Sequence, residues 1–229
     1  MKKTALVAGA TGLIGKELVY YLLSDPAYDK VKVVTRKSTK IADNKLEKIL
    51  VDFKSLKDHA DKLTANHYFI LLGTTMRKAK SKEKFYEVDF TYSYQLAEIA
   101  KNDPGFEKFL IATTYKASPH SMIFYNRVKG QLEEALKAIN LKSLHIFQPS
   151  LLLGFRNEFR LFEEASKIIL PILEMITFGQ IKFKAIEATT VAKAMLKVGK
   201  EGITGLHVYP SHIIEELSIS SLLPEDINA

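Results

Sequence analysis

The segment Gly9-Ala10-Thr11-Gly12-Leu13-Ile14-Gly15 follows an apolar run at residues 5–8 and leads into an amphipathic stretch at residues 13–23. In a strand–turn–helix unit, the first glycine permits a tight turn, the second lets the backbone approach a pyrophosphate, and the third lets helix and strand pack closely. The amide groups at the start of the helix then face the phosphates, where the helix dipole favours negative charge. The segment therefore predicts a dinucleotide phosphate site. The residues predicted to line it are Gly9, Thr11, Gly12, Leu13, Ile14 and Gly15.

Apolar runs typical of strands alternate with helical patterns along most of the chain. This order favours a doubly wound parallel sheet of the Rossmann type, an α/β fold with helices on both faces. The expected strands are residues 5–8, 31–35, 48–51, 68–72, 109–112, 144–147 and 206–209, and the expected helices are 13–23, 86–101 and 123–139. Residues 155–183 show no strict period and predict a small cap over the sheet. We expect a single domain over residues 1–229.

The composition excludes several classes of protein. The chain has no cysteine, so disulfides, thiolate nucleophiles and sulfur-ligated zinc are excluded, and a cytoplasmic location is expected. The six histidines lack metal-ligand spacing, so no metal site is expected. The basic and then apolar start has the outline of a signal peptide, but cleavage there would remove part of the glycine-rich turn. No apolar run is long enough to span a bilayer and no nucleic-acid-binding module is recognisable, so neither kind of partner is expected despite a net charge of +7.

The residues after the second expected strand distinguish the two nicotinamide cofactors. Proteins that bind NAD usually carry an acidic residue there, which hydrogen-bonds the ribose hydroxyls. This chain instead has Arg36, Lys37 and Ser38. Two cations and a hydroxyl suit a 2′-phosphate, so NADP(H) is expected in preference to NAD(H). The alternative is a solvated basic turn that contacts no ligand.

The order of the strands predicts that the ends of two further strands lie near the cofactor. Asp52 and Phe53 end the third expected strand and would flank the adenine, by a hydrogen bond and by packing. Gly73-Thr74-Thr75 ends the fourth, where its lack of bulk would let the cofactor cross the sheet. The alternative is that both are ordinary turns.

Tyr125 and Lys129 stand four residues apart, so they share one face of the helix expected at residues 123–139. Thr113 and Thr114 end the fifth expected strand about a dozen residues earlier, a spacing that allows hydroxyls and phenol to converge. The structural alternative is a helix tyrosine half-buried against the sheet.

With this constellation the chain resembles the short-chain dehydrogenase/reductase family, whose hallmark is a YxxxK pair with an upstream Ser or Thr. It is most similar to an atypical subgroup that includes the mammalian Tat-interacting oxidoreductase and bacterial relatives. The segments that carry the resemblance are Gly9 to Gly15, Leu72-Gly73-Thr74-Thr75, Val88-Asp89, Tyr125 to Gly130 and Pro149-Ser150-Leu151-Leu152-Leu153-Gly154. Together they extend over nearly the whole chain.

The resemblance implies an NADPH-dependent oxidoreductase that acts on an unidentified small molecule. Tyr125 would act as general acid toward a carbonyl oxygen, and Lys129 would stabilise the phenolate and hold the nicotinamide ribose. Thr113, with Thr114 as second choice, would donate a hydrogen bond to the developing oxyanion. Further cofactor contacts are implied for Leu72, Pro149, Leu151 and Leu152.

The chain also departs from that subgroup. Relatives usually have serine at Thr113, Gly-Ala at Lys116-Ala117, and arginine at Gln148, while extended family members carry asparagine at Asp89. These changes leave cofactor binding intact and put turnover and substrate choice in doubt. The alternative function is therefore a non-catalytic NADPH-binding regulator that controls a protein partner. The oligomeric state stays open.

Overall fold

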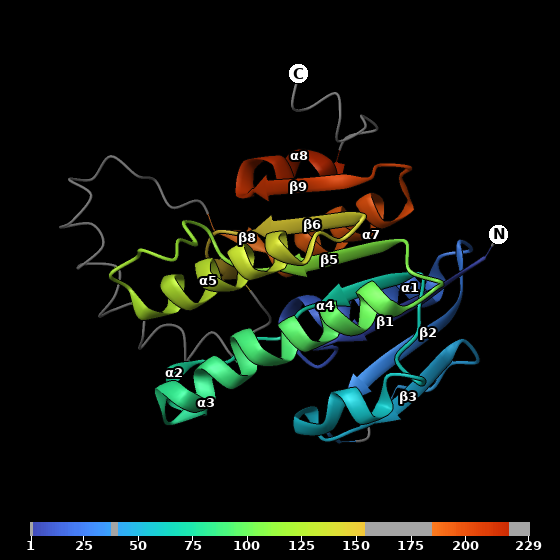
Figure 1. Cartoon of the computed structure of the whole chain (residues 1–229). Coiled ribbons are helices and arrows are strands. Elements are labelled where there is room, and N and C mark those ends of the chain that lie inside the picture. Colours follow the sequence, from blue (N-terminus) through green and yellow to red (C-terminus); the bar gives the residue numbers. More distant parts are fainter. Residues whose placement is uncertain (1, 38–40, 154–184, 220–229) are drawn as a thin grey trace.

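The computed structural model describes residues 2–37, 41–153 and 185–219. Its centre is a parallel sheet of seven strands in the order β3-β2-β1-β4-β5-β6-β9 (Figure 1). The strands are β1 (Lys3–Ala8), β2 (Tyr28–Thr35), β3 (Leu46–Leu50), β4 (His67–Ile70), β5 (Lys108–Ala112), β6 (Ser143–Gln148) and β9 (Gly205–Pro210). The chain runs outward from β1 to β3 and returns to β4 on the other side of β1. In open α/β sheets a ligand binds at the carboxyl ends of the strands beside such a reversal.

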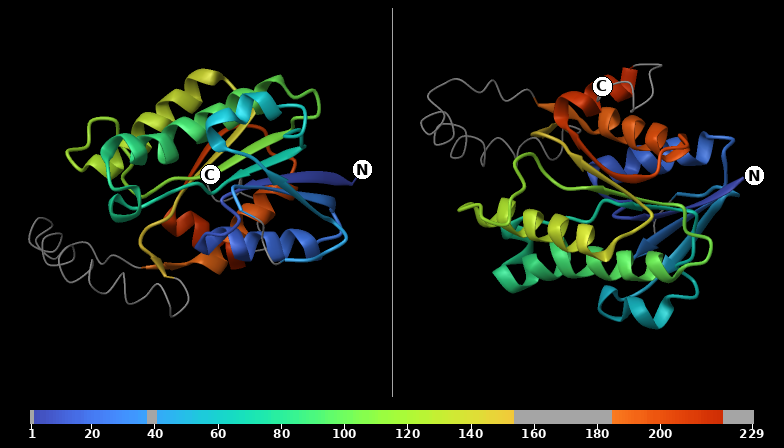
Figure 2. Two further views of the ribbon diagram at one scale, coloured as in Figure 1. Left: turned by 90° about the horizontal axis from the view of Figure 1, so that it is seen from below. Right: turned by 45° about the horizontal axis from the view of Figure 1, so that its top comes forward.

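Helices cover both faces of this sheet (Figure 2), so the predicted doubly wound α/β fold is confirmed. The helices on one face are α1 (Leu13–Ser24), α7 (Ala188–Lys200) and α8 (Ser211–Ile219). Those on the other face are η1 (Phe53–His59), α4 (Tyr92–Asn102) and α5 (Phe124–Ile139). Successive strand residues point to opposite faces. The interior therefore forms two apolar layers, with Val7 of β1 in one and Leu6 in the other.

The helix predicted over residues 86–101 is present but is not a regular α-helix throughout. It runs from α3 (Lys82–Tyr86) through a π turn η2 (Glu87–Thr91) into α4, and a separate short helix α2 (Met76–Ala79) precedes it. A π turn holds one residue more than an α-helical turn and often marks a functional site. Here it contains Asp89, whose side chain is completely buried.

Two short strands lie apart from the main sheet, where β7 (Leu152–Leu153) pairs with β8 (Ile186–Glu187). The cap predicted for residues 155–183 lies outside the described residues. Within the described ranges, no helix is both long and apolar enough to cross a membrane.

Buried polar groups line the amino-terminal half of the central strands. His67 Nδ1 lies 2.8 Å from the Tyr28 hydroxyl, and His145 Nδ1 lies 2.9 Å from the Tyr209 hydroxyl. Burial lowers the pKa of His67 to about 4 and that of His145 to about 3, so both rings are neutral near pH 7. Lys108 lies among them and donates to the carbonyl at Val198, near the end of α7. This polar layer holds the sheet to α7 at the edge opposite the glycine-rich turn.

Candidate functional site

The predicted phosphate turn connects β1 to α1 at the carboxyl edge of the sheet. Gly9 has a φ of +95°, and a Cβ there would lie 2.3 Å from the carbonyl oxygen of Leu71. A Cβ on Gly15 would lie 2.2 Å from the carbonyl oxygen of Gly9, so α1 packs directly on the turn. The fold itself therefore requires these two glycines.

Gly12 differs from both. Its backbone is extended, with φ −75° and ψ 176°, and a Cβ there would meet only the Gly9 oxygen, at 3.3 Å. Gly12 is the N-cap of α1 but has no side chain to cap it, and the first turn of α1 has no acidic residue. The first amides of a helix lack partners within the helix. The open space and the uncapped amides fit a phosphate group.

The basic residues predicted to select the cofactor follow β2, the strand beside β1. The Thr35 hydroxyl donates to the Lys37 carbonyl over 2.8 Å and accepts from the Lys37 amide over 3.3 Å, which orders this turn. Arg36 and Lys37 are both exposed at the same edge as the glycine-rich turn, and Ser38 lies outside the described residues. Recognition of a 2′-phosphate by these residues stays a prediction.

Asp52 and Phe53 have different surroundings. The Asp52 carboxylate accepts a hydrogen bond from the Lys54 amide over 3.0 Å and caps η1. Phe53 is buried in the core, with its ring centroid 5.4 Å from that of Tyr92. The phenylalanine thus supports the wall beneath the carboxyl edge, and contact of either residue with adenine stays a prediction.

A buried ion pair lies beneath the end of β4. Lys129 Nζ is 2.8 Å from Asp89 Oδ1, and both side chains are almost completely inaccessible to solvent. The same ammonium donates to the Leu72 carbonyl over 3.3 Å, while the second Asp89 oxygen accepts from the Thr74 amide over 2.8 Å. A Cβ on Gly73 would lie 3.5 Å from the carboxylate and 3.9 Å from the ammonium. The predicted strand end at residues 72–74 is therefore held directly against Lys129.

Sequence analysis named Asp89 only as a position that differs from the extended family and gave it no role in the site; the structure places it in the π turn, paired with Lys129. Burial alone would lower the pKa of Lys129, but the Asp89 carboxylate, followed by Tyr125 and Glu133, outweighs burial and raises it above its usual value. The raised pKa favours the charged form of Lys129, and Asp89 compensates this charge within the protein.

Tyr125 lies in the first turn of α5, one turn before Lys129 on the same face. Its ring is 37% exposed and meets the ring of Phe85 at 5.8 Å between centroids in an edge-on arrangement. The structural alternative was a tyrosine half-buried against the sheet, whereas the ring found here is exposed and contacts Phe85 of α3. A general acid must reach the group that it protonates, and the exposed phenol of Tyr125 is accessible to a ligand at this edge.

Thr113 is engaged elsewhere. Its hydroxyl donates to Glu133 Oε1 over 2.5 Å, and Gln148 Nε2 donates to both carboxylate oxygens of Glu133 over 3.1 and 2.9 Å. Burial raises the pKa of Glu133 above its usual value, although these hydrogen bonds oppose the rise. A hydroxyl has one proton to donate. In this structure Thr113 therefore buttresses Glu133, and the first choice of oxyanion donor is not free for a substrate.

The remaining predicted contacts end at the same edge. Leu72 is half-buried beside the ion pair, and the Pro149 carbonyl accepts from the Tyr115 amide over 2.9 Å. The Leu151 carbonyl accepts from the Ile186 amide over 2.8 Å, and Leu152 belongs to β7. Thr75 caps α2 by accepting from the Lys78 amide over 3.2 Å. Their contact with a cofactor stays a prediction.

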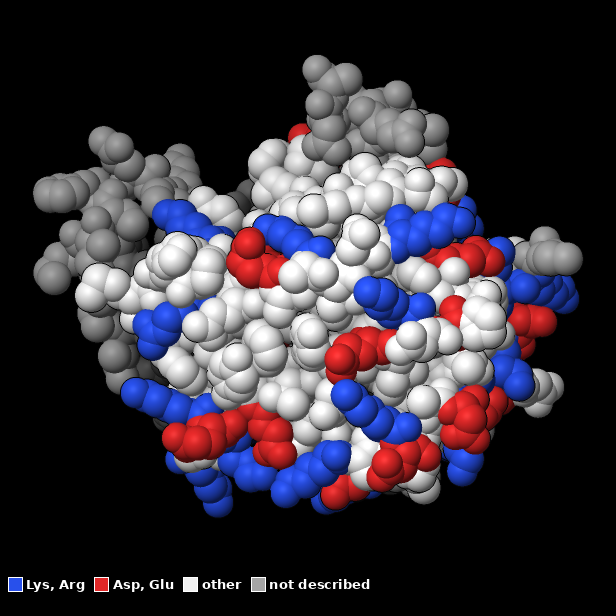
Figure 3. Space-filling model, viewed as in Figure 1, with Lys and Arg blue, Asp and Glu red and all other residues white. Residues whose placement is uncertain are grey.

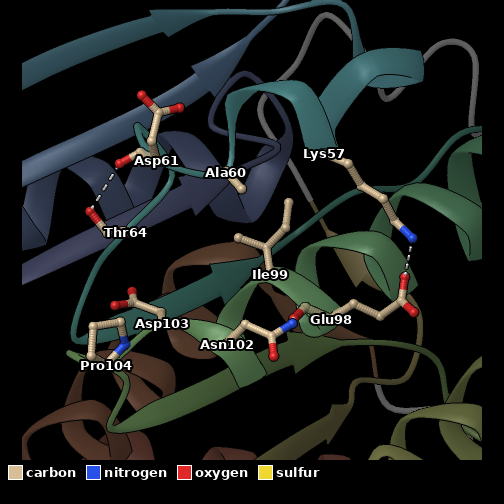
Figure 4. Close-up of a pocket in the computed structure, with 9 residues that line it drawn as sticks. All are labelled: Lys57, Ala60, Asp61, Thr64, Glu98, Ile99, Asn102, Asp103 and Pro104. Atoms are coloured by element: carbon tan, nitrogen blue, oxygen red, sulfur yellow. Dashed lines mark hydrogen bonds and ion pairs between the residues drawn. The ribbon is translucent and has the colours of Figure 1, made fainter.

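A hollow of about 460 Å³ lies away from this edge, between η1 and the end of α4 (Figure 4). Lys57 and Glu98, which line it, form an ion pair at 3.0 Å, and Asp103, which also lines it, already accepts from the Ala65 amide and the Tyr68 hydroxyl. None of the predicted site residues lines it. We therefore locate the candidate site at the carboxyl edge of the sheet, where the glycine-rich turn, the Lys129–Asp89 pair and Tyr125 lie. Within the described ranges no group of three or more possible metal-ligating side chains occurs.

Residues 5–133, which include the turn, the π turn and the Tyr125–Lys129 pair, match the NAD dependent epimerase/dehydratase family. The chain belongs to this family. Protein FMP52-1, mitochondrial, of Scheffersomyces stipitis is 32% identical over 189 residues, which cover 79% of this chain and 76% of that protein. Protein fmp52-1, mitochondrial, of Aspergillus terreus is 28% identical over 90% of each chain.

Solved structures of low identity support the fold of this family member. MoeE5 in complex with UDP-glucuronic acid and NAD superposes with a TM-score of 0.69 at 18% identity, over 90% of this chain and 75% of that one. Human epimerase family protein SDR39U1 with NADPH superposes with a TM-score of 0.63 at 14% identity, over 90% and 73%. One of these neighbours thus holds NAD and the other NADPH, so the comparison does not test the predicted preference of this chain for NADP(H).

The relatives correct the predicted location. Proteins 26% to 32% identical to this family member are named as mitochondrial, so the prediction of a cytoplasmic protein is wrong. The physical reason is that a lack of cysteine excludes disulfides but does not distinguish among compartments in which disulfides are absent.

Proposed function

We propose that this chain is an NADP(H)-dependent oxidoreductase that reduces a small carbonyl compound, and that it belongs to the atypical subgroup that its motifs resemble. The observation that carries this proposal is the Lys129–Asp89 pair beneath Gly73, one helical turn from the exposed phenol of Tyr125. All of these groups lie at the edge of the sheet that also holds the uncapped start of α1.

The residues at this edge fit a dinucleotide. The open position at Gly12 and the free amides of α1 would hold its phosphates, and Arg36 with Lys37 would hold a 2′-phosphate. Because Gly73 has no side chain, the ribose could approach Lys129, whose ammonium lies 3.9 Å from the position of a Cβ at residue 73. The reduced cofactor, when bound, supplies the hydride in such reactions.

The protein's own groups would supply the proton and hold the developing charge. Tyr125 would donate its phenolic proton to the carbonyl oxygen, and the nearby charge of Lys129 would stabilise the phenolate left behind. Since Glu133 accepts the Thr113 hydroxyl, we assign the oxyanion hydrogen bond to Thr114, which is the next residue and is half-buried.

The second candidate is a non-catalytic NADPH-binding regulator that controls a protein partner. The commitment of Thr113 to Glu133 favours it, because the resembling subgroup usually has serine at this position and the Thr113 hydroxyl already donates to Glu133 here. In this case the protein would bind the cofactor without turnover.

The replacement Tyr125→Phe separates the two candidates. It keeps the ring packing against Phe85 and should leave NADPH affinity within a few-fold, while carbonyl reduction found by screening should fall by about 10²–10⁴. Tyr20→Phe is the matched control, since Tyr20 is 66% exposed on α1. Reduction that survives Tyr125→Phe undiminished contradicts the proposed mechanism. Firm NADPH binding with no reduction of any carbonyl compound screened would favour the regulator.

A further inference from the structure

The loop before α5 exposes two large apolar side chains at its tip. Met122 is 96% exposed and Ile123 is 53% exposed. Exposed apolar side chains that form a continuous patch with a polar rim mark surfaces that contact another protein or a membrane. Figure 2 shows this loop projecting beyond the end of the sheet at the start of α5.

This exposure is held in place by the fold. The Ser121 hydroxyl accepts from the Ile123 amide over 3.2 Å. The Arg127 guanidinium donates to the Ser121 carbonyl over 2.8 Å and to the Met122 carbonyl over 3.4 Å. Further back, a Cβ on Gly130 would lie 2.1 Å from the Ser118 carbonyl carbon, so the loop packs directly on α5. The tip is thus presented by a supported backbone.

Cations and further exposed apolar groups surround the tip. The rings of Phe85 and Phe124 lie 5.4 Å apart and join α3 to α5. The Lys82 ammonium and the Arg127 guanidinium each lie 5.7 Å from the centre of the Phe124 ring. Beside them on α2 and α3, Met76 is 42% exposed and Tyr86 is 37% exposed. We call Met76, Lys82, Tyr86, Met122, Ile123 and Arg127 the docking rim.

The segments that carry the docking rim have a net positive charge. Residues 76–87 carry five Lys or Arg and two Glu, and residues 115–127 carry two Lys or Arg and no acidic residue. Together they hold a net charge of +5. Figure 3 shows basic side chains, interspersed with acidic ones, along the lower left of the molecule, where α2 and α3 lie in Figure 1.

We propose that the docking rim binds the surface of a membrane rich in anionic phospholipid. Met122 and Ile123 would enter the interfacial region, and the surrounding lysines would face the headgroups, which is how peripheral proteins combine apolar and electrostatic binding. A projecting tip of two side chains suits a penetrable headgroup layer, whereas a stable protein interface needs about 1,000 Å² of complementary surface. The sequence-based expectation of no membrane partner rested on spanning segments, which this mode of binding does not use.

The test is flotation of the full chain with vesicles of phosphatidylcholine, with and without about a third of phosphatidylglycerol. The unaltered protein should bind the anionic vesicles, and binding should fall as salt increases. Met122→Asp with Ile123→Asp should lower partitioning at least ten-fold. Lys82→Gln should lower it roughly five-fold, the effect of one charge near such a surface.

The matched control is Leu206→Asp with Val208→Asp on β9, because these side chains are also exposed, at 52% and 37%, and lie away from the docking rim. This control should bind vesicles as the unaltered protein does. All variants should have the same melting temperature as the unaltered protein. The proposal is overturned if the unaltered protein does not bind anionic vesicles. It is also overturned if both double variants lose vesicle binding to the same extent. A dimer that only the rim variant converts to a monomer would assign this surface to a second copy instead. NADPH titration is a separate readout, so failure of the proposed function would not affect this result.

Discussion

Replacing Gly12 with aspartate should make the fold slightly more stable and abolish dinucleotide binding. Gly12 is the uncapped N-cap of α1, and its extended backbone accepts any residue. An aspartate there would cap the free amides and complement the helix dipole, which stabilises by about 0.5–1 kcal/mol. The 3.3 Å approach of the new Cβ to the Gly9 oxygen offsets part of this gain. We expect a melting temperature between unchanged and about 3 °C higher.

Binding should respond in the opposite direction. The new carboxylate would occupy the place of a phosphate and remove two charge-assisted hydrogen bonds, each worth about 1.5–3 kcal/mol. The expected loss is about 3–6 kcal/mol, which corresponds to a rise of about 10²–10⁴-fold in Kd. Titration of NADPH followed by fluorescence or calorimetry measures this, beside a thermal melt of the same sample.

Gly202→Asp is the matched control, because a Cβ at Gly202 would meet nothing within 4 Å. It introduces the same charge outside the turn and should leave NADPH affinity unchanged. If Gly12→Asp binds NADPH within a few-fold of the unaltered protein, the turn is not the phosphate site. If it unfolds the protein, the helix start is not as open as the structure indicates.

Three other changes test separate parts of the structure. Arg36→Ala should reduce a preference for NADPH over NADH by about 1–3 kcal/mol, and equal affinity for both cofactors in the unaltered protein would contradict the assignment. Lys129→Met should destabilise the fold by about 3–5 kcal/mol in urea unfolding because it strands Asp89 as a buried charge, and adding Asp89→Leu should restore most of that loss. Lowering the pH should destabilise the protein through His67 and His145, whose folded-state pKa values of about 4 and about 3 lie below the unfolded value near 6.5. The stability that the two neutral histidines contribute is complete above about pH 6.5 and is lost as the pH falls toward 4 and 3, by about 3–5 kcal/mol for each residue. Urea unfolding at pH 7 and at pH 4.5 measures this difference. The free energy of unfolding should fall less between these two pH values when both histidines are replaced by glutamine.

Local patterns predicted the parts of the fold that depend on local forces. The turn at residues 9–15 is visible because its glycines, its strand and its helix are contiguous. The alternation of strands and helices was sufficient to predict the parallel sheet, because each strand must be followed by a crossover. Tyr125 and Lys129 were recognisable as a pair because helical spacing alone brings them to one face.

The contacts that define the site's electrostatics were not predictable in this way. Asp89 reaches Lys129 across forty positions of sequence, and only because a π turn interrupts an otherwise regular helical pattern. The hydrogen bonds from Thr113 and Gln148 to Glu133 join two strands and a helix. Thr113 and Gln148, two positions at which the chain departs from the subgroup that it resembles, thus together satisfy the buried carboxylate of Glu133. Comparing each position with the subgroup separately does not indicate this.

The π turn at Glu87–Thr91 makes the site depend on chain length as well as on residue identity. Deleting one residue from that turn would allow an unbroken α-helix, and every side chain on one side of the deletion would rotate by about 100° relative to the other. Asp89 would then turn away from Lys129 while every chemical group remained in the chain. A relative that lacks this one position would therefore be expected to carry a different counter-charge for its lysine, even if all of its other motif residues were identical.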